Sequence, residues 1–151
     1  VESVADQFKQ KLKQHGAYEI DAAQGEELLK HIFKEVKGPG EPGVINMDYI
    51  GKSPAFILKS IGLDVGAEAQ IVILEADKNH PLVWTEQIMP VLPFVRCRNA
   101  DEAIDAALAA EQGNGHTMAI HSNNIQTIQS TVKIVLTTAE SITKIIPYNR
   151  S

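Results

Sequence analysis

Five histidines and one cysteine are the side chains of this 151-residue chain best suited to bind a metal or to transfer a proton. The histidines are His15, His31, His80, His116 and His121. No two of them stand four residues apart, the spacing that brings two imidazoles onto one helix face, and one cysteine cannot build a thiolate zinc site. We therefore predict no metal centre. Cys97 ends an apolar run, so we expect a small buried side chain there rather than a nucleophile.

Two glycine-containing stretches match parts of nucleotide-binding motifs. Residues 38–43 read Gly-Pro-Gly-Glu-Pro-Gly, the spacing of a dinucleotide fingerprint, but they follow a predicted helix and their two prolines lack the N–H groups that would hold a phosphate. Gly51-Lys52-Ser53 resembles the end of a P-loop, yet Asn46 stands where that motif needs its first glycine. We therefore predict a loop at 38–43 and a helix start at Ser53, and no phosphate site at either place.

The composition is typical of a globular domain with an acidic surface. Apolar residues make up 44% and charged residues 22%, and 14 basic against 19 acidic side chains give a net charge of −5. This balance argues against a broad surface for nucleic acids or anionic membranes, and no window approaches the roughly 20 apolar residues of a membrane span. A lone cysteine excludes an intrachain disulfide and favours a reducing compartment. We expect a cytoplasmic protein whose partners include neither nucleic acid nor membrane.

Helices and strands alternate along the sequence. The apolar spacing of Val4, Phe8 and Leu12 predicts a first helix over residues 4–14, capped by Ser3. Four consecutive apolar residues within 69–75 predict a strand buried on both faces, as in a parallel sheet beneath helices. The other predicted helices are 22–37, 101–111, 124–133 and a segment that begins at Ser53-Pro54. The other predicted strands are 91–96 and 117–121, and Pro93 places the first of these at an edge of the sheet. We therefore predict a single α/β domain over residues 1–151. Its three layers are helix, sheet and helix, and the sheet is mostly parallel.

Three segments stand out by their order and spacing. Residues 79–93 read Asn-His-Pro-Leu-Val-Trp-Thr-Glu-Gln-Ile-Met-Pro-Val-Leu-Pro, residues 101–108 read Asp-Glu-Ala-Ile-Asp-Ala-Ala-Leu, and residues 115–122 read Gly-His-Thr-Met-Ala-Ile-His-Ser. Together they closely resemble the CoA-acylating aldehyde dehydrogenases, in particular those of ethanolamine and propanediol utilisation. The resemblance runs from residue 1 into the predicted helix at 124–133, and it implies part of an aldehyde dehydrogenase catalytic domain.

The resemblance also implies a reaction. A cysteine thiolate attacks a short-chain aldehyde, hydride passes to NAD, and the resulting thioester is handed to coenzyme A. The family's nucleophilic cysteine precedes the counterpart of Val1, and its nucleotide-binding domain also lies outside this chain, so we expect this chain to be inactive alone. The resemblance further implies a homo-oligomeric parent enzyme, in the cytoplasm or in a bacterial microcompartment. The alternative is a non-catalytic α/β module that binds CoA, a nucleotide or a partner protein.

Four residues acquire roles from the resemblance. Glu86 matches the glutamate that holds the nicotinamide ribose hydroxyls, against the alternative of an exposed loop carboxylate. Ile88 takes the position, two residues on, that is usually aromatic and lies beneath the nicotinamide. His116 matches a histidine that could deprotonate or orient the CoA thiol, against the alternative of a structural histidine, and Thr117 could contribute a nearby hydroxyl. His80 belongs to a matching Asn-His-Pro run, where a structural turn is an equal alternative to a functional role.

Overall fold

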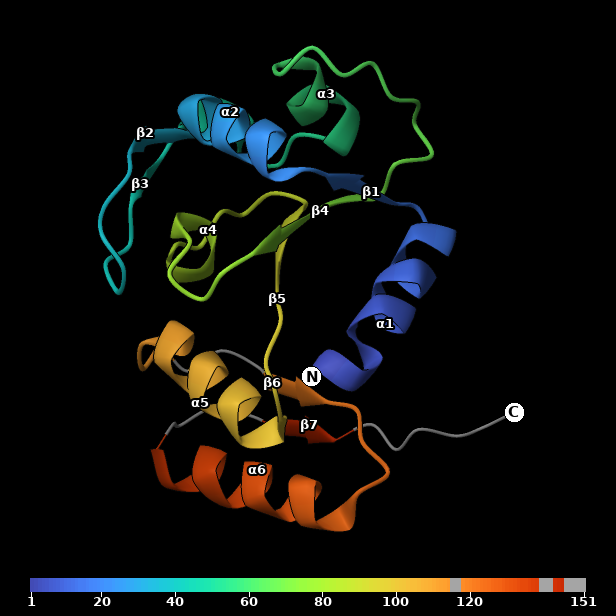
Figure 1. The fold of residues 1–151 in the computed structure, drawn as a ribbon. Helices are drawn as coiled ribbons and strands as arrows, with labels where there is room; N and C mark the ends of the chain where they lie inside the picture. The colour runs from blue at the N-terminus through green and yellow to red at the C-terminus, as the bar shows by residue number, and fades with distance from the viewer. Residues whose placement is uncertain (115–117, 139–142, 146–151) are drawn as a thin grey trace. The chain divides into compact units, whose positions relative to one another are not determined.

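The computed structural model describes residues 1–114, 118–138 and 143–145. The chain divides into two compact units, an N-terminal unit, Val1–Arg96, and a C-terminal unit, Cys97–Ser151 (Figure 1). The predicted organisation as one domain over residues 1–151 stays a prediction. Each unit has its own strands and helices and is described by itself.

A parallel sheet forms the centre of the N-terminal unit. Its strands are β1 (Ala17–Ile20), β4 (Ile71–Ala76) and β5 (Val91–Val95), in the order β1-β4-β5 (Figure 1). The prediction of an α/β fold with a parallel sheet is confirmed. The central strand β4 carries the predicted buried run, and Pro93 lies on the edge strand β5, as its missing N–H donor requires.

Helices α2 (Ala22–Ile32) and α3 (Pro54–Lys59) pack with one face of this sheet. Asp21 and Gln24 form a capping box at the start of α2, and Ser53 caps α3 ahead of Pro54, as predicted. Gly25 lets α2 approach the sheet closely, because a Cβ there would lie 2.7 Å from a methyl carbon of Leu74. The buried core consists of Ile20, Leu28, Leu29, Ile32, Phe33, Ile57, Leu58, Val72, Leu74, Leu82 and Val91.

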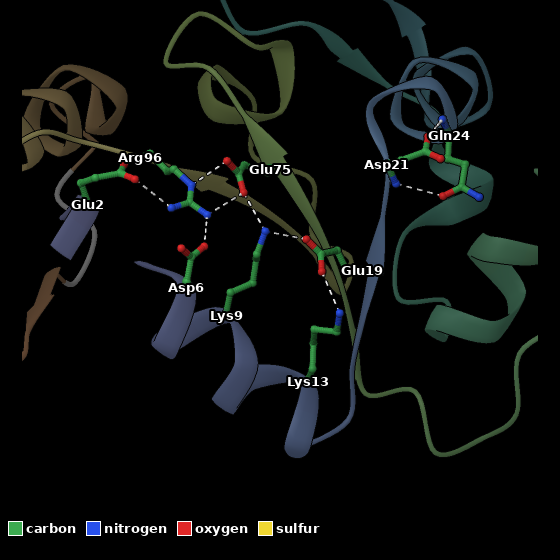
Figure 2. Close-up of polar contacts among 9 residues, drawn as sticks. All are labelled: Glu2, Asp6, Lys9, Lys13, Glu19, Asp21, Gln24, Glu75 and Arg96. Carbon is green, nitrogen blue, oxygen red and sulfur yellow. Dashed lines mark hydrogen bonds and ion pairs between the residues drawn. The ribbon is translucent and has the colours of Figure 1, made fainter. Parts of the chain in front are cut away.

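The opposite face of the sheet meets α1 (Glu2–Gln14), and this contact includes a group of ion pairs (Figure 2). Glu75 of β4 lies at its centre: the Arg96 guanidinium approaches it to 2.6 Å and the Lys9 ammonium to 2.7 Å. The remaining pairs are Lys9–Glu19 at 2.7 Å, Lys13–Glu19 at 2.9 Å, Arg96–Glu2 at 3.1 Å and Arg96–Asp6. We call these residues the α1 ion cluster.

The apolar stripe of α1 is only partly covered, although Leu12 is half-buried. Val4 is 52% and Phe8 54% exposed, whereas the buried residue of the helix is Ala5. Phe8 contacts Phe94 of β5, with ring centroids 6.1 Å apart. The predicted cap was wrong, because α1 starts at Glu2 after Val1 and Ser3 lies inside its first turn. The helix periodicity was therefore correct, but it marked a face that the N-terminal unit itself leaves partly exposed.

The helix predicted over residues 22–37 ends at Ile32, and the chain then forms a hairpin. Strands β2 (Phe33–Glu35) and β3 (Val44–Ile45) pair antiparallel around the predicted loop at 38–43. Asn46 competes with a longer helix: its backbone N–H donates to the Ile32 carbonyl at 2.8 Å and its side-chain amide to the His31 carbonyl at 3.0 Å. These bonds satisfy carbonyls that a continuing helix would have used. A 3-10 helix, η1 (Met47–Tyr49), follows β3.

The C-terminal unit contains α5 (Ala100–Glu111), β6 (Met118–Ile120), α6 (Ile125–Thr138) and β7 (Thr143–Ile145). Asn99 caps α5 by accepting the Glu102 N–H at 2.9 Å with its side-chain oxygen. Strands β6 and β7 pair in parallel, which agrees with the predicted parallel sheet. In the described parts of the chain, no helix is both long and apolar enough to cross a membrane.

Acid should release α1 while the core of the N-terminal unit stays folded. Hydrogen bonds from Arg96, and next from Lys9, lower the pKa of Glu75 from 4.5 to about 2. A carboxylate whose pKa is lowered on folding stabilises the folded state above its unfolded pKa, and this contribution is lost as the pH falls from 4.5 to about 2. We expect amide hydrogen exchange across α1 to accelerate in this window before exchange in β4 does.

Glu75→Gln tests the origin of this acid sensitivity. The change should lower the free energy of unfolding at neutral pH by roughly 1 kcal/mol and reduce the acid response of α1, to which Asp6 and Glu19 still contribute. The control is Glu41→Gln, which alters an exposed carboxylate on the 38–43 loop and should change neither quantity. The same acid response in the wild type and in Glu75→Gln would contradict the assignment.

Candidate functional site

His80 begins the segment that carries the longest family-like run. It caps the short helix α4 (Pro81–Trp84), because its Nδ1 accepts the Leu82 N–H at 3.3 Å and Pro81 takes the first helical position. Burial lowers the pKa of His80, which favours the neutral imidazole that can accept this bond. The structure therefore supports the structural-turn alternative for His80.

Residues 85–90 form the loop that leads from α4 into β5, and several hydrogen bonds fix its start. Thr85 is buried, and its hydroxyl accepts the N–H of Gly43 at 2.9 Å. The side-chain amide of Gln87 donates to the carbonyls of Leu82 and Thr85. The loop is therefore tied to the end of the β2–β3 connection on one side and to α4 on the other.

Glu86 is exposed on this loop, directly after the buried Thr85. Among the described residues, none forms a hydrogen bond or ion pair with its side chain. A carboxylate with both oxygens free can accept two hydrogen bonds at once, as two neighbouring hydroxyls would supply. This arrangement suits a ligand with a vicinal diol, and it differs from the carboxylates of the α1 ion cluster, which are already paired.

Ile88 lies two residues beyond Glu86 with its side chain 62% exposed. Its backbone is left-handed, with φ of 50°, and its carbonyl accepts the N–H of Gly51 at 3.1 Å. The loop thus presents a free carboxylate and a bare apolar side chain close together in the chain. Such a pair offers a ligand one polar and one apolar contact.

The other predicted site residues belong to the C-terminal unit. His116 and Thr117 lie outside the described residues, so the structure does not bring them together with Glu86 and Ile88 or separate them. His121 follows β6, and Cys97 is buried, in agreement with its predicted character. Within the described ranges, no group of three or more His, Cys, Asp or Glu side chains is arranged to hold a metal ion.

Sequence reasoning missed the residues that hold the loop. The sequence alone assigns Thr85 and Gln87 no role beyond membership of the family-like run, and it assigns Gly51 no role as a support of the loop. Thr85 bonds to Gly43, 42 positions away in the sequence, and Gly51 bonds to Ile88, 37 positions away. Gln87 bonds to Leu82 and Thr85 across a turn. One local signal was present: an uncharged polar residue, Thr85, directly follows the apolar stretch of α4 and could have suggested a buried hydroxyl.

A hollow of about 470 Å³ opens between α1 and β1, away from the loop at 85–90. Its cationic lining residues are Lys9 and Lys13, and both are paired with Glu19. An anionic ligand would have to displace that carboxylate. We therefore place the candidate site at the loop and not in this hollow.

Comparison with known proteins gives consistent results, although no family model matches the chain. It is 38% identical over 125 residues to the acetylating acetaldehyde dehydrogenase EutE of Salmonella typhimurium, covering 83% of this chain and 27% of that protein. It is 35% identical over 142 residues to an acetylating acetaldehyde dehydrogenase of Bilophila wadsworthia, covering 91% of this chain and 29% of that protein. The chain therefore spans less than a third of the length of these relatives.

Solved structures agree with the sequence relatives. A propionaldehyde dehydrogenase of Rhodopseudomonas palustris with bound propionyl-CoA superposes with a TM-score of 0.82 at 32% identity, over 96% of this chain and 30% of that one. A propionaldehyde dehydrogenase from the fucose utilisation microcompartment of Clostridium phytofermentans gives a TM-score of 0.79 at 29% identity, over 96% of this chain and 31% of that one.

Removing the buried hydroxyl at position 85 should destabilise the loop. Thr85→Val keeps the shape of the side chain but leaves the Gly43 N–H without its acceptor, which should cost about 1–2 kcal/mol in the free energy of unfolding. The matched variant Thr85→Ser retains the hydroxyl and should keep the Gly43 amide protected from hydrogen exchange. Urea unfolding and exchange rates check both; an equally protected Gly43 amide in Thr85→Val would rule this bond out.

Proposed function

We propose that this chain, a homologue of one segment of the CoA-acylating aldehyde dehydrogenases, serves in the oxidation of a short-chain aldehyde to its acyl-CoA. The observation that carries this proposal is the exposed carboxylate of Glu86 on a loop fixed by Thr85 and Ile88. Glu86 accepts hydrogen bonds from the ribose hydroxyls of NAD. Ile88 lies against the nicotinamide ring and supplies an apolar contact.

Several relatives support a nucleotide and CoA as the small-molecule partners. The Rhodopseudomonas palustris enzyme binds propionyl-CoA, and an engineered glycolyl-CoA reductase, 31% identical to this chain, binds NADP⁺. A nicotinamide cofactor accepts hydride from the substrate, and CoA accepts the acyl group. The choice of NAD over NADP for this chain is part of our proposal.

His116 and Thr117 are proposed for the acyl-transfer half of the reaction. A neutral imidazole at His116 takes the proton of the CoA thiol or orients it, and the Thr117 hydroxyl lies nearby. Cys97 is buried, which does not favour attack on an aldehyde. We propose that the nucleophilic cysteine comes from the part of the longer relatives that this chain does not span.

The assembly and the location of the parent enzyme are further parts of the proposal. We propose that the parent enzyme is a homo-oligomer, located in the cytoplasm or in a bacterial microcompartment. The Clostridium phytofermentans neighbour comes from such a compartment, which supports this location.

A segment exchange tests the proposed function directly. The matching part of the Salmonella typhimurium relative is replaced by this chain, and NADH formation is followed with acetaldehyde, NAD⁺ and CoA. We expect CoA-dependent NADH formation by the hybrid and none by the isolated chain. A folded hybrid without activity would overturn the proposal, and CoA binding by the isolated chain would then favour the non-catalytic module.

Glu86→Gln in the hybrid tests the role of the carboxylate. The amide accepts fewer hydrogen bonds and carries no charge, so kcat/KM for NAD⁺ should fall about 10- to 100-fold, equivalent to roughly 1.4–2.8 kcal/mol. Glu41→Gln, on the exposed 38–43 loop, is the matched control and should leave kcat/KM unchanged. Equal kinetics for both variants would remove Glu86 from the site.

A further inference from the structure

Gly51 and Ile88 face each other with left-handed backbones, at φ values of 69° and 50°. Glycine adopts this conformation freely, but a β-branched residue rarely does. Among the described residues, the other non-glycine with positive φ is Gln112, which ends α5 and so has an ordinary reason for it. Ile88 ends no helix, and its side chain is mostly exposed, so neither capping nor burial explains its strain.

One hydrogen bond accounts for the conformation of Ile88. Its carbonyl accepts the Gly51 N–H at 3.1 Å, and this bond joins the loop at 85–90 to the turn before α3. We call these two residues the 51–88 clasp. A Cβ on Gly51 would meet nothing within 4 Å, so position 51 requires glycine for its backbone angle and not for space.

The clasp connects the loop to the core of the N-terminal unit. On the far side of Gly51, the Lys52 N–H donates to the Tyr49 carbonyl at 3.2 Å, and Ser53 caps α3. Helix α3 buries Ile57 and Leu58 completely. The position of Ile88 is therefore fixed by a turn that is itself anchored in the core.

We propose that Gly51 and Ile88 are positioning residues for the Glu86 carboxylate. The Thr85–Gly43 bond fixes the loop directly before Glu86, and the 51–88 clasp fixes it two residues later. A carboxylate held between two such points loses little conformational freedom when a ligand binds, which strengthens binding. This proposal rests on the role of Glu86 in nucleotide binding given above, and it assigns the strain at Ile88 to that role.

Gly51→Ala and Gly62→Ala form a matched pair for the test. Both glycines have positive φ, 69° and 77°, and a Cβ at either would enter open space, so both variants strain the backbone similarly. Of these two glycines, Gly51 bonds to the loop at 85–90 and Gly62 bonds to Lys59 instead. In the full 151-residue chain labelled with nitrogen-15, Gly51→Ala should speed hydrogen exchange of the residue-51 amide at least tenfold and lower the heteronuclear NOE at Glu86. Gly62→Ala should leave both unchanged.

Nicotinamide mononucleotide is the ligand probe, followed by the chemical shift of the Glu86 amide. We expect millimolar binding to the wild type, several-fold weaker binding to Gly51→Ala and unchanged binding to Gly62→Ala. The absence of binding to the wild type would count against the ribose role of Glu86. The exchange rate of the residue-51 amide and the NOE at Glu86 would still test whether the 51–88 clasp positions the loop. Failure of the positioning proposal can therefore be distinguished from failure of the ribose role.

Ile88→Asn tests the strain itself. Asparagine tolerates the left-handed region, so this variant should raise Tm by about 3 °C or more while the residue-51 amide stays protected. Ile88→Val keeps the β-branch and should leave Tm nearly unchanged. The proposal is overturned if Gly51→Ala and Gly62→Ala affect Glu86 equally, or if Ile88→Asn exposes the residue-51 amide.

Discussion

Strand β4 is covered on both faces, and the N-terminal unit is organised around that requirement. Val72 and Leu74 belong to the apolar core with α2 and α3, while Ile73 and Glu75 face the other side, because successive side chains alternate along a strand. Hydrophobic burial secures the first side. On the second side Ile73 is also fully buried, and charged groups of α1 and Arg96 converge on Glu75 (Figure 2). The layer on this side thus adds ion pairs to apolar burial.

Elements with strong local signals could be predicted from the sequence. The apolar run of β4 and the Ser53-Pro54 start of α3 both depend on residues next to one another. Strand β1 was missed because Tyr18 and Glu19 interrupt its apolar character, and its place is decided by pairing with a distant strand. The helix at 22–37 was overextended because Asn46, far along the chain, ends it.

The candidate site likewise contains some residues that the sequence could predict and others that it could not. The resemblance to a family named Glu86 and Ile88, since both occur within a continuous and specific run of residues. It could not name Thr85 or Gly51 as supports, because their roles arise from contacts between segments that only the folded chain brings together. The loop that carries Glu86 is thus a local sequence feature whose shape is determined by remote backbone groups.

Pro93 has a consequence for how the sheet meets other molecules. The Val72 N–H donates to the Pro90 carbonyl. Backbone groups alternate in direction along a strand, so Pro90 and every second residue after it direct theirs towards β4. Pro93 belongs to the other set, whose backbone groups point outward. The outer row of donors along β5 is therefore interrupted at its middle. A strand from another molecule could not form a continuous row of hydrogen bonds with β5. This protects the edge against the edge-to-edge strand pairing that leads to aggregation.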